Sequence, residues 1–330
     1  MRAIRITTFA LALAVTAFAA AGCNPKASAS GKPASTSVVV HTAPGGGSDV
    51  FTRQVIKLMQ QTKLISGNWP VNNQSAGASI GAMSYLNGKS GSSTTIAAIT
   101  PTWLVTPMTL HTTTVKFDTF QPIAEILVEP YMMIVPANSP FKTANDFVTA
   151  AKAQPDHYVQ AGGSLTAVDS LDGKALQANT GAKWKYLTFS DVGSRITALL
   201  RGDAQVMIAS PVDVASELKS GKFRAIAVVG AQAIPSYPAV PTLKAEGIDL
   251  GDSLPAEFRG FVGPPNMPAS ALAYYQGLFA KLVKTPQWAS FVAANGDISQ
   301  YADGADFKAL LTDQEKSLST LVSQLNLGQS

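Results

Sequence analysis

The glycine loop at residues 43–49, which reads Ala-Pro-Gly-Gly-Gly-Ser-Asp, constrains the fold more than any other feature of the chain. A run of three valines precedes it, as in a buried strand, and Phe51, Val55 and Met59 follow it at the spacing of a helix with one buried face. The loop is therefore predicted to be a strand-to-helix turn. Glycines open backbone conformations that other residues avoid, and the first amides of a helix lack internal partners, so such a turn is suited to holding an anion. The alternative is that the glycines serve tight packing alone and that Ser48 is only an N-cap.

Residues 1–22 have the pattern of a secretory signal peptide. Arg2 and Arg5 form a basic start, and the apolar stretch at 9–21 is too short to remain as a membrane-spanning helix. We therefore expect the mature protein in the periplasm.

Cys23 is the only cysteine of the chain and directly follows the signal peptide, as the lipidated cysteine of a bacterial lipoprotein does. A lone exposed thiol would be a liability in an oxidising compartment, which favours lipidation. Ala20 stands where a lipobox usually has leucine, so cleavage that leaves Cys23 unmodified is the alternative. Residues 23–36 are predicted to combine the lipid-attachment site with a flexible tether, and membrane contact is expected through this lipid anchor only.

The rest of the chain, about 300 residues, is longer than one domain usually is, so two lobes are expected. The 25 basic and 21 acidic residues give a formal net charge of +4, and the basic ones are scattered without a run of like charge. This pattern argues against nucleic acid as a partner. A single cysteine excludes internal disulfides, and no second apolar run is long enough to span a membrane. The protein is expected to be a monomer.

Strand-like and helix-like segments alternate almost throughout, and apolar strands of this kind favour parallel sheets covered on both faces. Segments 120–128 and 223–229 are interpreted as crossings between lobes. Lobe 2 is then an insertion at 126–227, and lobe 1 consists of 37–125 and of 228–330 with the C-terminal helices. The predicted strands lie at 38–41, 69–73, 95–99, 131–135, 157–160, 204–209 and 224–228, and the predicted helices at 49–62, 144–153, 169–178, 193–201, 211–220, 269–284 and 307–325.

A second glycine loop begins at Gly162 and again lies between a predicted strand and a predicted helix. Ser164 and Thr166 would offer hydroxyls beside main-chain amides, which suits a small ligand with acceptor oxygens. Asp49 and Asp169 stand at the two helix starts, where their charges would offset part of the positive helix dipoles. They are expected either to stabilise their own helices or, if they face the cleft, to orient a ligand hydroxyl, an ammonium group or a water molecule.

Motifs of the common enzyme classes are missing from the sequence. It contains no G-x-S-x-G nucleophile elbow, and the glycine loops do not complete the G-x-G-x-x-G pattern of dinucleotide binding. His41, His111 and His157 lie far apart without metal-ligand spacing. No catalytic residue, cofactor or metal is therefore predicted. A hydrolase that uses Ser48 and His41 is the enzymatic alternative, and it would require ester or phosphate turnover that Ser48→Ala abolishes.

Three further side chains are candidates for the cleft. Trp103 and Phe189 follow predicted strand ends, where cleft loops lie, although either could be a core residue. Arg259 interrupts an apolar strand pattern. It is expected either to be solvated at a sheet edge, which is the favoured interpretation, or to face an acidic partner, because an arginine can grip a carboxylate with two hydrogen bonds.

Several motifs, in one order along nearly all of the mature chain, resemble those of the substrate-binding proteins of tripartite tricarboxylate transporters, the Bug-type receptors. Residues 44–49 match the family's P-G-G-G-[ST]-D. The other matching motifs are N-N-Q-S-A-G-A-S-I-G at 72–81, F-Q-P-I-A at 120–124, G-G-S at 162–164 with Asp169, L-L-R-G at 199–202, G-K-F-R-A-I-A-V at 221–228 and V-P-T at 240–242. Each motif is weak alone, and their joint order carries the resemblance.

The resemblance implies an α/β protein with the fold of type II periplasmic binding proteins, in which two lobes of mixed sheets flanked by helices enclose a hinged cleft. It also implies a receptor that captures a small organic carboxylate, either a di- or tricarboxylate or an aromatic acid. The receptor would deliver this ligand to the permease subunits of a tripartite transporter. A receptor that reports ligand binding to a sensor kinase is the alternative.

In such receptors the two glycine loops hold a ligand carboxylate through backbone amides, hydroxyls and ordered waters. Thr42 stands where many relatives have an aromatic residue, Phe189 where they often have tyrosine, and Gln205 where aspartate is usual. The segment around Arg259 resembles the tricarboxylate branch of the family. The expected ligand-binding residues are Thr42, Gly46, Gly47, Ser48, Asp49, Thr102, Ser164, Thr166, Ala167, Asp169, Phe189 and Arg259.

Overall fold

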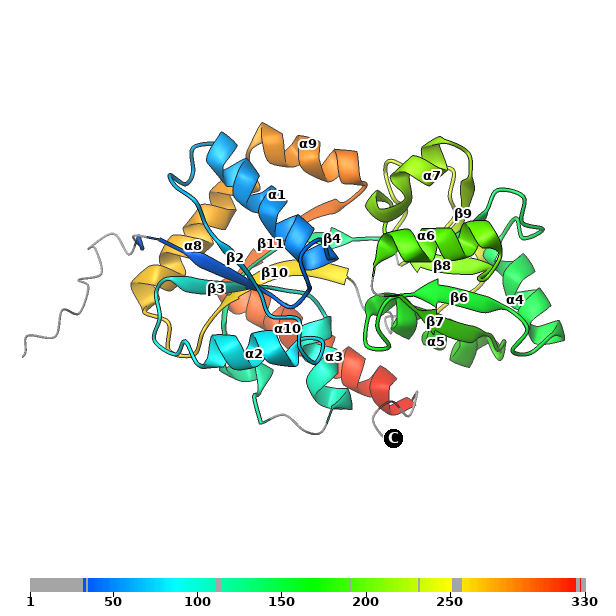
Figure 1. Cartoon of the computed structure of the whole chain (residues 1–330), viewed down its shortest axis with the longest axis horizontal. Coiled ribbons are helices and arrows are strands. Elements are labelled where there is room, and N and C mark those ends of the chain that lie inside the picture. The colour runs from blue at the N-terminus through cyan, green and yellow to red at the C-terminus, as the bar shows by residue number, and fades with distance from the viewer. Residues whose placement is uncertain are drawn as a thin grey trace, which may run out of the picture.

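The computed structural model describes residues 32–33, 35–110, 114–189, 191–230, 232–250, 257–324 and 327. The predicted signal peptide, Cys23 and His111 lie outside these residues. The described chain forms two lobes, each built on one sheet with helices on both faces (Figure 1). Both sheets are mixed, which confirms the predicted α/β fold class.

Sheet A belongs to lobe 1 and has six strands in the order β11-β4-β10-β3-β1-β2. The strands β2, β1 and β3 pair in parallel, whereas β10, β4 and β11 are added in antiparallel pairs. The strands are β1 (Ser37–Val40), β2 (Val71–Asn73), β3 (Thr95–Ile99), β4 (Gln121–Glu129), β10 (Glu257–Gly263) and β11 (Ile298–Asp303).

Sheet B belongs to lobe 2 and has five strands in the order β7-β6-β8-β5-β9. Here β7, β6 and β8 are parallel, and β5 pairs antiparallel with both β8 and β9. The strands are β5 (Tyr131–Pro136), β6 (Val159–Gly162), β7 (Lys185–Thr188), β8 (Val206–Ala209) and β9 (Phe223–Val229).

Six helices of the described chain pack on sheet A, and four belong to lobe 2 (Figure 1). In lobe 1 these are α1 (Gly47–Gln61), α2 (Ile80–Asn87), α3 (Thr102–Thr109), α8 (Ala269–Leu282), α9 (Pro286–Asn295) and α10 (Gly304–Gln324). In lobe 2 they are α4 (Ala144–Ala153), α5 (Val168–Thr180), α6 (Val192–Arg201) and α7 (Ala215–Lys219), and three short 3-10 turns lie at Phe117–Thr119, Val212–Val214 and Lys244–Glu246.

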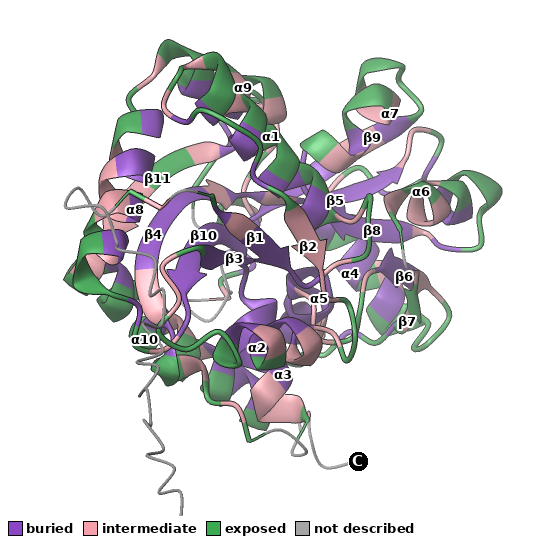
Figure 2. Ribbon diagram, turned by 60° about the vertical axis from the view of Figure 1, so that its left-hand side comes forward, coloured by how far each residue is buried: buried purple, intermediate pink, exposed green. Residues whose placement is uncertain are grey.

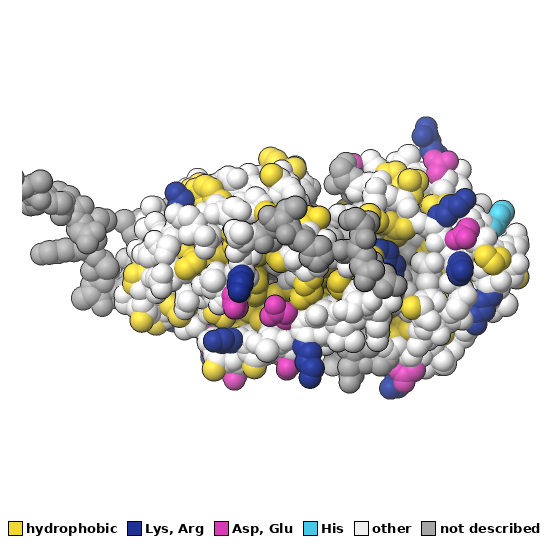
Figure 3. Space-filling model, turned by 90° about the horizontal axis from the view of Figure 1, so that it is seen from below, with side chains coloured by type: hydrophobic (Ala, Val, Ile, Leu, Met, Phe, Trp, Pro, Cys, Tyr) yellow, Lys and Arg dark blue, Asp and Glu magenta, His cyan; other side chains and the backbone are white. Residues whose placement is uncertain are grey.

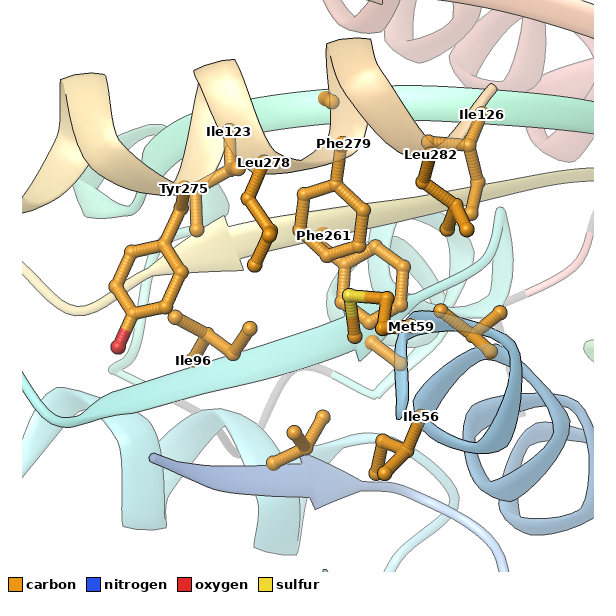
Figure 4. Packing of buried hydrophobic residues seen from close by; sticks show 14 of the residues in the cluster. Ile56, Met59, Ile96, Ile123, Ile126, Phe261, Tyr275, Leu278, Phe279 and Leu282 are labelled. Carbon is orange, nitrogen blue, oxygen red and sulfur yellow. The ribbon is translucent and has the colours of Figure 1, made fainter. Parts of the chain in front are cut away.

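The inner strands β1, β3 and β8 are almost wholly apolar because both faces of each sheet are covered, whereas the edge strands β2, β7 and β11 carry polar residues. In β1, Val38 and Val40 pack with α1, α8 and α9, whereas Val39 packs with α2, α3 and α10. Figure 4 shows the first of these layers, where Phe279 of α8 stacks on Phe261 of β10 with ring centroids 4.3 Å apart. Figure 2 shows the consequence, since the central strands of both sheets are buried and the exposed residues lie mostly on helices and loops.

Helix α5 takes part in the packing of both lobes. Its Leu176 packs in the core of lobe 2 with Phe147 of α4. Its Leu171 lies instead with Trp103 and Phe258 in a core of lobe 1. The helix that begins after the second glycine loop therefore forms an apolar contact between the lobes.

The chain passes from lobe 1 to lobe 2 at Pro130, between β4 and β5, and returns between Gly230 and Glu257. The segment 120–128, interpreted as a crossing, is mostly β4, which pairs with β10 and β11 before the chain leaves sheet A. The segment 223–229 is β9 and lies wholly within sheet B, because its apolar residues pair with β5. Ile248 also packs in the core of lobe 2, so this lobe extends further along the chain than 126–227.

Candidate ligand-binding site

The first glycine loop connects β1 to α1 at the edge of sheet A where the parallel strands end. Ligands of open α/β sheets commonly bind at this edge. Gly45 has a φ of +83°, a conformation that favours glycine. A Cβ on Gly46 would lie 2.7 Å from the Cβ of Thr42, so this position also requires glycine. Helix α1 then begins at Gly47 without a side-chain cap from Gly46.

Asp49 closes this loop on itself. Its carboxylate accepts hydrogen bonds from the amide of Gly45 at 2.9 Å, from Arg53 Nε at 3.0 Å and from Asn73 Nδ2 at 3.0 Å. Burial alone would raise the pKa of Asp49, but the hydrogen bonds from Arg53, Gly45 and Asn73 outweigh it and hold the pKa below its ordinary value. The amide of Asp49 donates to Thr42 Oγ1 at 3.1 Å. Thr42 and Asp49 thus brace the loop from within.

Arg259 lies on β10, between β3 and β4 in the interior of sheet A, so the prediction of a solvated arginine at a sheet edge is wrong. Its guanidinium donates two hydrogen bonds to Glu129, at 2.9 and 2.7 Å, and one to Ser48 Oγ at 3.3 Å. Burial would lower the pKa of Arg259, but Glu129 and Glu257 outweigh burial and raise the pKa. The arginine therefore joins the start of α1 to the strand that leads into lobe 2.

The second glycine loop occupies the corresponding edge of sheet B, after β6, which lies between its parallel neighbours β7 and β8. Helix α5 begins at Val168, and Ala167 before it has an extended backbone and provides no side-chain cap. Ser164 is exposed and Thr166 is half-buried, and their hydroxyl oxygens lie 3.2 Å apart. Phe189 is tied to the loop because its amide donates to the carbonyl of Gly162 at 2.9 Å.

Asp169 repeats in lobe 2 the arrangement of the first loop. Its carboxylate accepts hydrogen bonds from the amide of Gly163 at 2.7 Å and from the hydroxyl of Tyr186 at 3.1 Å. Burial raises the pKa of Asp169, and Arg195, whose Nη1 lies 3.8 Å away, opposes this shift. In each lobe an aspartate in the first turn of a helix therefore holds a glycine amide of the loop before it.

The expected site residues form one group in each lobe. Thr102 starts α3 at the end of β3, next to the first loop's strand, and its carbonyl accepts from Ser79 Oγ at 3.2 Å. Lobe 1 contributes Thr42, Gly46, Gly47, Ser48, Asp49, Thr102 and Arg259, and lobe 2 contributes Ser164, Thr166, Ala167, Asp169 and Phe189.

Sequence reasoning missed several residues that organise these loops. Asn73 belongs to the motif at 72–81, so its role was accessible from the sequence. Tyr186, Arg195 and Glu129 reach the site from separate elements, and no local pattern connects them with Asp169 or Arg259.

His41 ends the β1 strand region beside the first loop and is buried there. Its Nδ1 accepts a hydrogen bond from Trp103 Nε1 at 3.1 Å, while Ser48 Oγ accepts from Arg259. Trp103 itself is fully buried in the core. These partners give no support to a pair in which His41 activates Ser48.

The buried imidazole of His41 is expected to remain neutral in the folded protein. Burial, together with the charge of Arg259, lowers its pKa from 6.5 to about 3. Because the unfolded chain binds this proton more readily, the stability linked to His41 is complete above pH 6.5 and is lost as the pH falls towards 3. An NMR titration of the imidazole nitrogens should show a neutral ring at pH 5, and a midpoint near pH 6.5 in the folded protein would contradict this environment.

The described residues contain no group of three His, Cys, Asp or Glu side chains that could hold a metal ion. Among the same residues, no helix is long and apolar enough to cross a membrane. On the face seen in Figure 3, lysine and arginine side chains are scattered, several of them beside acidic ones, and do not form a continuous basic patch.

Comparison with known proteins identifies the family. Residues 50–327 match the model of the tripartite tricarboxylate transporter family receptor. A UPF0065 protein of Cupriavidus necator is 24% identical over 199 residues, which are 60% of this chain and 59% of that protein. A UPF0065 protein of Bordetella bronchiseptica is 23% identical over 295 residues, or 88% of this chain and 85% of the relative.

Solved structures share the fold. The periplasmic binding protein BugD has a TM-score of 0.78 at 19% identity, over 90% of this chain and 99% of its own. A Rhodopseudomonas palustris protein solved with adipate has a TM-score of 0.76 at 16% identity, with coverages of 89% and 97%. MatC from Rhodopseudomonas palustris, with bound malate, has a TM-score of 0.72 at 17% identity, with coverages of 88% and 98%. Because residues 50–327 match the family model, the chain belongs to the family of receptors of tripartite tricarboxylate transporters.

Proposed function

We propose that this receptor captures a small organic carboxylate between its two glycine loops and delivers it to the permease of a tripartite transporter. The observation that carries the proposal is the pair of helix starts that directly follow the two glycine loops. Neither Gly46 before α1 nor Ala167 before α5 caps its helix through its own side chain, although in α1 Thr42 Oγ1 accepts from the amide of Asp49 at 3.1 Å. Uncapped first-turn amides at the positive end of a helix favour an anionic ligand.

The charges around the loops are compatible with an anion. Asp49 is paired with Arg53 at 2.9 Å, and both Asp49 and Asp169 fold back onto glycine amides of their own loops. Arg195 lies 3.8 Å from Asp169 and 3.9 Å from Asp213, too far for hydrogen bonds, so we propose that its donors reach towards the ligand. A cation at this position favours a ligand with a second carboxylate.

The adipate and malate of the two Rhodopseudomonas palustris structures make dicarboxylates the first class to test. Binding would involve residues of both lobes, so we propose that the ligand stabilises a closed arrangement. No covalent step is part of this function.

We also propose that the mature chain is a periplasmic monomer held to the membrane through a lipid on Cys23.

A thermal-shift screen of the soluble chain from Asn24 onward tests the proposed function. A ligand that binds only the folded state adds about 2.7 kcal/mol of stability at a hundredfold excess over its dissociation constant. We expect one class among mono-, di- and tricarboxylates, aromatic acids and amino acids to raise the melting temperature. A folded, ligand-free sample that responds to none of these acids would contradict the proposal.

Removing one loop hydroxyl should weaken carboxylate binding in either lobe. We expect Ser48→Ala and Thr166→Ala each to cost about 1 kcal/mol, or roughly fivefold in affinity by calorimetry, if each hydroxyl gives one hydrogen bond to the ligand. Thr94→Ala is the matched control, because Thr94 forms a pair with Ser92 at the same 3.2 Å spacing, away from both loops. Unchanged affinity in both loop variants would count against these residues.

A further inference from the structure

A cavity lies at the hinge. It reaches the start of α5 at Val168, but none of the expected ligand-binding residues lines it. Its volume is about 570 Å³, within the range of small-molecule sites. It is bounded by Pro130 at the crossing into lobe 2, by Gly230 directly after β9, and by residues of β11, α5 and α10. We call it the hinge cavity, and its key residues are Glu125, Glu129, Asp172, Glu257, Phe258 and Leu310.

We infer that the hinge cavity binds a small amphipathic ammonium compound, meaning a primary ammonium group on an apolar chain. The two parts of this ligand correspond to two parts of the cavity wall. Phe258 and Phe307 of lobe 1, Ile248 of lobe 2 and Leu310 of α10 provide an apolar surface. Five carboxyl groups belong to the polar part, those of Glu125, Glu129, Asp172, Asp249 and Glu257.

The carboxyl groups of the hinge cavity outnumber the cations that face them. Glu129 takes both strong hydrogen bonds of Arg259, while Glu257 lies 3.8 Å from the same guanidinium. Lys244 also lines the cavity, but it is 71% exposed and its Nζ lies 3.3 Å from Asp249. One buried arginine is therefore the counter-ion of two buried glutamates.

Asp172 is the group that points most directly to a ligand. It lines the cavity from α5, is only 2% exposed, and its Oδ1 has no hydrogen-bond partner among the described residues. A buried polar atom without a hydrogen-bond partner is costly, so a ligand that donates a hydrogen bond to Asp172 Oδ1 would remove that cost.

Glu125 of β4 also lines the cavity. Its carboxyl accepts a hydrogen bond from Gln300 Nε2 at 3.1 Å. Burial raises the pKa of Glu125 to about 7 and that of Glu257 to about 8, and raises that of Asp172 well above its ordinary value. Burial is the main cause of all three pKa shifts, and the charges of nearby carboxylates add to it at Asp172 and Glu257. A bound ammonium group would lower these pKa values.

Calorimetric titration with hexylammonium chloride tests the inference, with hexanol as a neutral analogue and hexanoate as an anionic one. We expect one hexylammonium per wild-type chain and at least about tenfold weaker binding of both analogues. No binding of hexylammonium at millimolar concentration, or tighter binding of hexanoate, would overturn the inference.

Two variants locate the binding to this cavity. Asp172→Asn keeps the size of the side chain and its neutral form, so the variant should fold, yet hexylammonium should bind at least about tenfold more weakly. Leu310→Lys places a competing ammonium at the cavity and should have the same effect. Leu110→Lys is the matched control, since Leu110 is 40% and Leu310 36% exposed but only Leu310 lines the cavity. If all three variants bind hexylammonium equally well, the assignment of the ammonium site to the hinge cavity is overturned. The thermal-shift screen with carboxylates tests the proposed function separately from this result.

Discussion

Replacing Arg259 by methionine is expected to destabilise the protein by about 3–5 kcal/mol, the usual cost of removing one partner of a buried ion pair. The substitution leaves Glu129 and Glu257, each only 7% exposed, without their cation. It also removes the guanidinium that lies 5.5 Å from the ring centre of Phe51. Urea denaturation should show the loss as a lower transition midpoint.

Arg53→Met is the control for this prediction. Arg53 also pairs with an acid, Asp49 at 2.9 Å, but its side chain is 52% exposed, so its loss should cost no more than about 1 kcal/mol. Adding Glu129→Gln to Arg259→Met should recover part of the stability, because one uncompensated charge disappears. Equal effects of Arg53→Met and Arg259→Met would contradict the buried cluster.

Gly162→Ala is expected to reduce carboxylate affinity at least about tenfold while the protein stays folded. A Cβ at this position would lie 2.1 Å from the hydroxyl of Tyr186 and 2.5 Å from Asp169 Oδ2. Both groups hold the second loop in place, so making room for the methyl group displaces the loop and costs about 1–3 kcal/mol of stability. Calorimetry and urea denaturation measure the two effects.

The neighbouring glycine is the matched control. A Cβ on Gly163 would meet no atom closer than 3.5 Å, which is an ordinary contact. Gly163→Ala should therefore leave affinity and stability close to those of the wild type. If both variants bind the carboxylate like the wild type, the second loop does not take part in binding as proposed.

The sequence correctly predicts those helices, strands and turns whose positions are determined by local sequence patterns. The predicted strand at 95–99 and the predicted helix at 144–153 coincide with β3 and α4, because each has continuous apolar periodicity and clear ends. Both glycine loops lie on strand-to-helix turns, as predicted. Helices α2, α3 and α9 were missed; α2 and α3 are short, and α3 contains Pro107.

Long-range pairing accounts for most of what the sequence could not predict. Arg259 looked like a surface residue because Glu129, its partner, lies 130 positions away. The crossings were misplaced because β4 and β9 each pair along almost their full length before the chain changes lobes. The roles of Tyr186 and Arg195 beside Asp169 likewise depend on how β7 and α6 assemble around α5.

An NMR titration of the backbone amides with a carboxylate tests the central claim most directly. The ligand should be the acid that raises the melting temperature most, with malate as the first choice. We predict that the amides at the starts of α1 and α5, Gly47, Ser48 and Val168, shift together and saturate at one carboxylate per chain. Shifts confined to one lobe would contradict capture between the two glycine loops.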